Sequence, residues 1–126
     1  MLAGADLIGF VPVRNAVAAR AFYEGTLGLD VLEDTPFALV LDANGTMLRV
    51  TPVGEFAVQP FTVAGWKVPD IESTVRGLSE KGLGFTRFDG MSQDELGIWT
   101  APSGDRVAWF RDPDGNTLSL TTFAGR

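Results

Sequence analysis

Apolar and polar residues alternate with two different periods along the first half of the chain. A period of two, typical of a strand, runs through residues 6–13, and a helical period of about 3.6 follows in residues 16–28. Asn15 is expected to cap this helix and Gly28 to end it. Three strands are then predicted, at about 29–33, 36–42 and 45–53, and Asn44-Gly45 before the last one is a strong hairpin signal.

The same order of elements recurs in the second half. Residues 54–60 are interpreted as a linker, and the pattern that follows predicts a strand at 61–68 and a helix at 70–81. Strands are again expected after the helix, at 83–88, 97–101, 106–111 and 117–123. Placing Val13-Arg14-Asn15 on Val68-Pro69-Asp70 brings the two helices into register directly after matching strands. The repetition is one of architecture more than of sequence.

The repeated order predicts an α+β fold made of two βαβββ modules, at about 6–53 and 61–123, within a single domain of residues 1–126. One helix per module leaves one face of its strands bare. We therefore expect the modules to form a curved mixed sheet around a cup, with the helices outside. In the first helix, the apolar residues Val17, Ala21 and Leu27 are predicted to share one face, with Phe22 beside them.

Composition narrows the classes of function. The net charge is −6, from 16 acidic and 10 basic side chains, and no basic stripe is present, which argues against nucleic-acid binding. No apolar run is long enough to span a bilayer, and the start lacks the features of a secretion signal. We expect a cytoplasmic protein with no membrane partner. The chain has no histidine and no cysteine, so imidazole and thiolate chemistry are excluded.

Two motifs carry a resemblance to a known family. Phe22-Tyr23 with Leu27-Gly28-Leu29, and Asp112-Pro113-Asp114-Gly115-Asn116 before the last strand, resemble motifs of the vicinal oxygen chelate superfamily. That superfamily includes glyoxalases, extradiol dioxygenases and bleomycin-resistance proteins. Both motifs are structural, and one fold hosts many functions, so the resemblance implies the fold more strongly than the chemistry.

The resemblance also implies where a metal would bind. Metal-binding members of the superfamily place four ligands on strands that line the cup, and these positions fall here on Ile8, Arg49, Val63 and Ser119. Isoleucine and valine offer no lone pair, and arginine carries a positive charge that repels a cation. We therefore expect no metal and no other cofactor at this site.

Strand alternation predicts which other side chains line the cup. Ile8, Phe10, Met47 and Val63 would form its apolar part, with Pro12 and Gly65 on the same faces. Arg49 and Lys67 would supply positive charge, and hydroxyl groups would come from Thr51, Thr117, Ser119 and Thr121. Leu7, Val11 and Val13 are expected to meet the helix instead.

Arg49 leaves two interpretations open. It either grips an anionic group of a ligand or has a structural role, paired with Asp94 or Glu95 or reaching the rim of the cup. Lys67 lies near a strand end, where solvation is the simpler interpretation.

The segment 88–95 is interpreted as a flap over the cup mouth, with Met91 and Trp99 as ligand contacts, although Trp99 is equally consistent with core packing. Trp66 and Trp109 are predicted to be core residues. Tyr23 is predicted to pack in the core rather than to transfer protons. Asp94, Glu95 and Lys67 are the candidates for acid–base work.

The leading hypothesis is a metal-independent protein that binds a small molecule, as the drug-sequestering members of the superfamily do. The ligand would be amphipathic and anionic, and the protein a homodimer whose cups or edges meet across subunits. One rival is a lyase, isomerase or dioxygenase-type enzyme with a non-standard site, and the other is a module that serves only for interaction.

Overall fold

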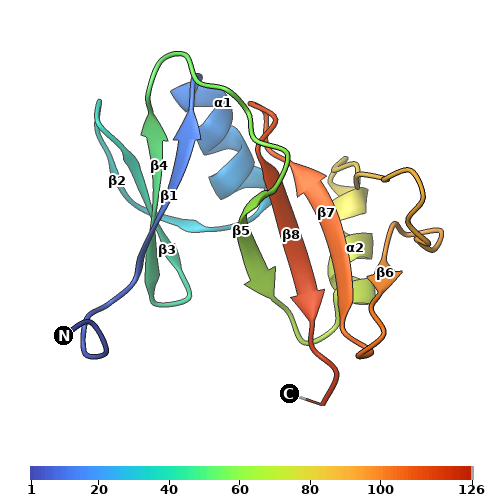
Figure 1. Cartoon of the computed structure of the whole chain (residues 1–126). Helices are drawn as coiled ribbons and strands as arrows, with labels where there is room; N and C mark the ends of the chain where they lie inside the picture. The colour runs from blue at the N-terminus through green and yellow to red at the C-terminus, as the bar shows by residue number, and fades with distance from the viewer. Residues whose placement is uncertain (126) are drawn as a thin grey trace. The chain divides into compact units, whose positions relative to one another are not determined.

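A computed structural model describes residues 1–125, which divide into two compact units at Val58 and Gln59. Each unit contains one four-stranded mixed sheet and helical turns, so the α+β prediction of two βαβββ modules is confirmed (Figure 1). Within residues 1–125, no helix has the length and apolar character needed to cross a membrane.

The first unit has strand order β1-β4-β3-β2, in which β1 runs parallel to β4 and the other pairs are antiparallel. Its elements are β1 (Ile8–Val13), α1 (Ala16–Arg20), the π-helix η1 (Ala21–Thr26), β2 (Asp30–Asp34), β3 (Leu39–Ala43) and β4 (Thr46–Pro52). The sheet buries one face, to which successive strands contribute Val11, Val13, Leu39, Leu41, Leu48 and Val50. The helix α1 contacts β4 on this side. The sequence also predicts Leu7 there, but this residue precedes β1 and is 77% exposed.

The first helix starts as predicted and then widens. The side chain of Asn15 accepts a hydrogen bond from the backbone N–H of Ala18 at 3.0 Å and caps the helix. From Ala21 the backbone becomes a π-helix, and the N–H of Leu27 bonds to the carbonyl of Phe22, five residues back. Helical turns of this type are rare and costly. Gly28 follows with a φ of 77° that suits glycine.

The predicted apolar face of this helix is wrong at Val17 and Ala21, whereas Leu27 is half-buried. Ala19, Phe22 and Tyr23 are buried, whereas Val17 is 83% exposed and Ala21 is also exposed. The physical reason is that the two rings bury far more apolar area than Val17 and Ala21 would. Tyr23 is fully buried and its ring meets that of Phe22 edge to face at 5.1 Å, which agrees with its predicted packing role.

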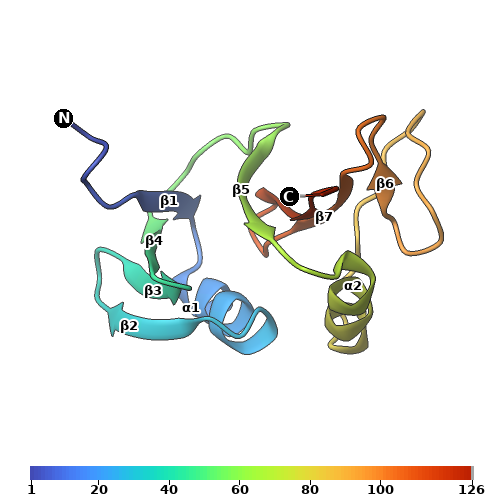
Figure 2. The same ribbon diagram turned by 90° about the horizontal axis from the view of Figure 1, so that it is seen from below.

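The second unit has strand order β5-β8-β7-β6, with β5 parallel to β8. Its elements are β5 (Thr62–Lys67), α2 (Ile71–Glu80), β6 (Trp99–Thr100), β7 (Arg106–Arg111) and β8 (Thr117–Thr122). The helix α2 lies against one face of the sheet and contacts β7 and β8 (Figure 2). Phe110 and Leu118 are fully buried there, and the half-buried Trp66 stacks on Phe110 at 6.3 Å, on the side of the sheet predicted for it.

The strand predicted at residues 83–88 is not formed. Only an isolated bridge joins Phe85 to Phe110, and the N–H of Thr86 bonds to the carbonyl of Trp109 at 2.7 Å. The side chain of Gln93 takes the place of a strand partner: it accepts from the N–H of Phe88 at 2.8 Å and donates to two carbonyls, those of Thr86 and Gly97. Such side-chain hydrogen bonds provide partners for backbone groups of a loop that is not paired with a strand. The hydrophobic periodicity of the sequence does not reveal them.

The turn between β7 and β8 is held by a buried carboxylate. One oxygen of Asp112 accepts from the backbone N–H groups of Asp114 at 3.0 Å and Asn116 at 2.9 Å, and the other accepts from the Asn116 side-chain amide at 2.9 Å. Asp112 and Asn116 are 5% and 2% exposed. Because the loop closes in this way, Arg111 stands opposite Thr117 and the register of the hairpin is fixed.

Replacing this carboxylate should destabilise the protein. Asp112→Ala removes the acceptor of two donors of buried Asn116, and a buried donor that loses its acceptor costs about 1–3 kcal/mol. The free energy of unfolding in urea measures this loss. The exposed Asp89→Ala is the matched control and should stay near the wild-type value. Equal stability of both variants would contradict the role given to Asp112.

Candidate functional site

In the first unit, the sheet face turned away from the buried core carries the side chains that sequence alternation predicted. The strand register pairs Ile8 with Met47, Phe10 with Arg49, and Pro12 with Thr51. Neighbours in a register row point to the same side of a sheet. The side chains predicted from β1 and those predicted from β4 therefore lie side by side. We call the surface that they form the unit 1 face.

Arg49 has apolar neighbours on this face. In the register it lies between Phe10 on β1 and Val40 on β3, and it is half-buried, whereas Phe10 is 62% exposed. Among the described residues of its unit, none forms an ion pair with Arg49. The Thr51 hydroxyl donates a hydrogen bond of 3.4 Å to the backbone carbonyl of Arg49. Arg49 is thus a cation with apolar flanks and no internal counter-ion among the described residues of this unit.

A hollow of about 300 Å³ lies at the start of this face. Ile8 and Met47 line it together with Leu7 and Leu32, and two carboxylates stand at its edge. They belong to Asp6 and to Asp42, of which Asp42 already accepts from the backbone N–H of Gly45 at 2.8 Å. The hollow is therefore apolar inside and acidic at its rim.

In the second unit, the corresponding face is built from two rows of side chains. Gly65, Ser119 and Trp109 form one row, and Lys67, Thr121 and Val107 form the next. Ser119 is 8% exposed. A Cβ on Gly65 would come within 2.5 Å of the Ser119 hydroxyl oxygen, so only glycine lets these two strands approach so closely. We call this surface the unit 2 face.

The prediction that Trp109 belongs to the core is wrong. Trp109 is half-buried, and its register opposite Ser119 places it on the unit 2 face, away from buried Phe110 and Leu118. Its ring centroid lies 5.4 Å from that of Phe88, edge to face, and 6.2 Å from that of Trp99. Trp99, a predicted ligand contact, joins Trp109 in an aromatic cluster on this face.

The remaining predicted residues of the second unit are placed at the edges of this face. Val63 is half-buried at an irregularity of the β5 register, and Lys67 is exposed, with its ammonium 6.0 Å from the Phe123 ring. Met91 is half-buried in the segment 88–98, which Gln93 ties together. That this segment acts as a flap stays a prediction.

Asp94, a candidate partner for Arg49 and a candidate acid–base group, has other contacts. One of its oxygens accepts from the backbone N–H groups of Leu96 and Ile98, each at 2.9 Å, and the other lies 3.7 Å from a guanidinium nitrogen of Arg106. Its role in the structure is to hold the turn before β6. The side chain of Glu95 is exposed.

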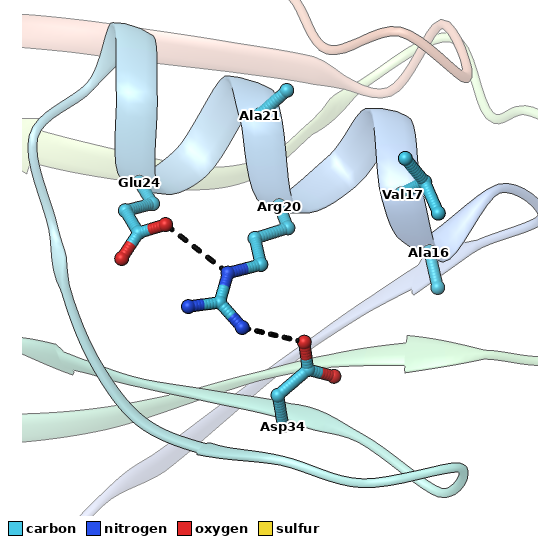
Figure 3. Close-up of a pocket in the computed structure, with 6 residues that line it drawn as sticks. All are labelled: Ala16, Val17, Arg20, Ala21, Glu24 and Asp34. Atoms are coloured by element: carbon cyan, nitrogen blue, oxygen red, sulfur yellow. Dashed lines mark hydrogen bonds and ion pairs between the residues drawn. The ribbon is translucent and has the colours of Figure 1, made fainter.

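A further hollow of about 400 Å³ lies outside both faces, beside α1 and η1 (Figure 3). Arg20 donates to Glu24 at 3.1 Å and to Asp34 at 2.7 Å, and exposed Val17 lies beside them. The pKa of Arg20 is raised above its usual value by its hydrogen bonds to Glu24 first and Asp34 second, so the group stays charged. Because these charges already satisfy one another, this hollow offers less to a ligand than the two faces.

The positions at which the superfamily holds a metal do not fit one in this chain. Ile8 and Val63 have no donor atom, Arg49 is a cation, and the Ser119 hydroxyl is packed against Gly65. Over residues 1–125, no three carboxylates are grouped closely enough to hold a metal ion.

Sequence reasoning missed Trp109 and Arg111 as residues of the unit 2 face. The signal was present in the hairpin, because a five-residue loop from Asp112 to Asn116 sets Arg111 opposite Thr117 and hence Trp109 opposite Ser119. Since alternation predicts the face on which Ser119 lies, its partner across the strand pair follows from the loop length.

Comparisons with known proteins agree with this architecture. Residues 6–120 match the family model described as Glyoxalase/Bleomycin resistance protein/Dioxygenase superfamily. No curated protein is similar enough in sequence to match the chain.

Among solved structures, one similar protein is TnmS3, an antibiotic binding protein from Streptomyces sp. CB03234, with 26% identity, a TM-score of 0.70 and coverage of 98% of this chain and 99% of that one. A superfamily member from Sphaerobacter thermophilus DSM 20745 has a TM-score of 0.74 at 21% identity, over 97% and 99% of the two chains. A lactoylglutathione lyase from Agrobacterium tumefaciens has a TM-score of 0.72 at 15% identity, over 94% and 93%.

The last two likenesses show the fold alone. The family match covers most of the chain and agrees with the two observed modules and with the motifs at Phe22-Tyr23 and Asp112 to Asn116. The chain belongs to the glyoxalase/bleomycin resistance protein/dioxygenase superfamily.

Proposed function

We propose that the protein binds a small amphipathic anion without a metal ion, and that Arg49 anchors the anionic group. The observation that carries the proposal is the half-buried residue Arg49, which lies between Phe10 and Val40 in the register and has no carboxylate partner among the described residues of its unit. A cation that loses part of its hydration without a partner is unfavourable, and a bound carboxylate or phosphate compensates for that loss.

The surroundings of Arg49 favour an amphipathic ligand over a bare ion. Phe10, Ile8 and Met47 share its face and offer apolar contact, and Thr51 adds a hydroxyl nearby. Concave or exposed apolar surface with a few polar anchors is typical of sites for small organic ligands. The structural likeness to an antibiotic binding protein at 26% identity supports a binding function.

Metal independence is part of the proposal. It is supported by the residues at the four positions where the superfamily places metal ligands, since three of them, Ile8, Arg49 and Val63, cannot coordinate a cation.

We also propose that the protein acts in the cytoplasm as a homodimer. Several large apolar side chains are exposed, among them Phe10 at 62%, Phe37 at 79% and Phe61 at 58%, and self-association would cover some of this surface. Sedimentation equilibrium measures the mass in solution; a monomer at all concentrations tested would contradict this part of the proposal.

Removing the guanidinium should weaken binding of anionic probes. Hydrogen bonds to a charged group contribute about 1.5–3 kcal/mol, so Arg49→Ala is expected to raise the Kd by roughly 10- to 100-fold. Titration calorimetry with a panel of amphipathic carboxylates, such as decanoate and 2-naphthoate, measures the change. Arg49→Lys keeps the charge but loses the planar guanidinium, so its Kd should lie between those of the wild type and Arg49→Ala.

Arg76→Ala is the matched control, because Arg76 is exposed on α2 and its removal changes the net charge by the same amount. An unchanged Kd in Arg49→Ala for every probe that binds, or equal losses in both variants, would overturn the anchor.

The purified protein should contain no stoichiometric metal, and divalent ions should not raise its Tm. A ligand that binds only the folded state raises the apparent stability with the logarithm of its concentration above the Kd, so a tight metal site would be visible as a shift in thermal unfolding. Elemental analysis with thermal unfolding in Mn²⁺, Fe²⁺, Mg²⁺ and Ca²⁺ is the measurement. One equivalent of bound Mn²⁺ or Fe²⁺ would contradict the proposal and favour an enzyme.

A further inference from the structure

A small hollow of about 160 Å³ lies on the unit 2 face, in the unit that does not contain Arg49. Strands β5, β7 and β8 and the loop before β6 contribute its walls, which include Phe61, Thr62, Phe88, Trp109, Arg111 and Thr117. An engineered cavity of about 150 Å³ is large enough to hold benzene, so this hollow has room for one six-membered ring.

One side of the hollow is aromatic and held in place. The rings of Phe88 and Trp109 meet edge to face, with an interplanar angle of 86°. The ring of Trp99 lies beside that of Trp109, with the two centroids 6.2 Å apart. The backbone of Phe88 is fixed by its N–H bond to the side chain of Gln93. Phe61 is 58% exposed and adds a further ring. Aromatic rings prefer such offset and edge-to-face contacts with another ring.

The other side of the hollow is polar and has no internal partner within residues 1–125. Arg111 and Thr117 stand opposite each other in the β7–β8 register, and Thr117 is 7% exposed. Neither the Arg111 guanidinium nor the Thr117 hydroxyl bonds to any residue in the described part of the chain. Within the same part, no fully inaccessible side-chain nitrogen or oxygen lacks a partner, so the Thr117 hydroxyl is reached from the hollow.

The neighbouring carboxylate does not neutralise Arg111. Asp112 adjoins it in sequence, but the oxygens of Asp112 accept from Asp114 and Asn116 within the turn. The guanidinium and the hydroxyl across one strand pair are therefore both donors that lack acceptors among the described residues. A planar carboxylate can accept from both, and the guanidinium fork matches its geometry.

We propose that this hollow binds a single-ring aromatic carboxylate. The ring lies against Trp109 and Phe88, and the carboxylate accepts hydrogen bonds from the Arg111 guanidinium and the Thr117 hydroxyl. The site does not use Arg49. This site can therefore be disproved while the proposed function at Arg49 holds, and the proposed function can be disproved while this site holds.

Benzoate is the probe, and titration calorimetry with quenching of tryptophan fluorescence is the readout. Arg111→Gln and Thr117→Val are each expected to raise the Kd for benzoate by about tenfold or more, because each removes a hydrogen bond to a charged group. Thr117→Val keeps the shape of the side chain, and circular dichroism confirms that each variant is folded. Arg76→Gln is the matched control, because Arg76 is exposed on α2, and it should bind benzoate as the wild type does.

Benzamide and inorganic phosphate separate the two halves of the site. Benzamide keeps the ring but lacks the charge, and phosphate keeps the charge but lacks the ring, so both should bind at least about tenfold more weakly than benzoate. Equal affinity for benzamide, equal affinity for phosphate, an unchanged Kd in Arg111→Gln, or no benzoate binding at all would each overturn this site. If Arg49→Ala loses 2-naphthoate binding and the wild type does not bind benzoate, this site is ruled out and the proposed function holds.

Discussion

Each four-stranded sheet packs most of its buried apolar side chains on one face, and this constraint determines the rest of the arrangement. Side chains alternate along a strand, so residues such as Val50 and Leu118 can be buried only if their sequence neighbours point the other way. A fully buried aliphatic or aromatic side chain contributes about 1.5–3 kcal/mol. A slip of β4 by one residue would bury Arg49 in the core and expose Val50, so the register is firmly set.

The same alternation places the chemically distinctive residues. Arg49 lies on the unit 1 face because its sequence neighbours Leu48 and Val50 are buried on the opposite side of the sheet. Trp109 lies on the unit 2 face because its neighbours Ala108 and Phe110 are buried in the same way. The two faces differ in character. The first is apolar, with Phe10 beside the cation Arg49, and the second is aromatic with hydroxyl groups and Arg111. Both contrast with the Arg20 cluster, where two carboxylates already neutralise the cation.

The fold was predictable from the sequence because its signals are local and repeated. Hydrophobic period, the Asn15 cap and the turn at Asp112 to Asn116 each specify one element, and the order of elements implies the modules. The missing strand near Phe85 could not be foreseen, because it depends on the Gln93 side chain bonding to three backbone groups. The exposed Val17 reflects competition with larger rings for the same core, which is a tertiary effect.

The candidate site was predictable in part. Alternation along single strands places Ile8, Phe10 and Arg49 on one face, and the register confirms that placement. Alternation misses Trp109, because a tryptophan in an apolar run resembles a core residue until its strand is paired with the next. Partners of charged groups, such as those of Asp94, depend on loop conformation and are not encoded in any periodicity.

The central claim is that the faces turned away from the buried cores, rather than the core sides, hold the ligand. The three tryptophans test it directly by NMR, because Trp99 and Trp109 lie on the unit 2 face and Trp66 stacks on core residue Phe110. During titration with an aromatic carboxylate, the indole N–H signals of Trp99 and Trp109 should shift and that of Trp66 should stay in place. A shift of Trp66 as large as the other two would contradict the account.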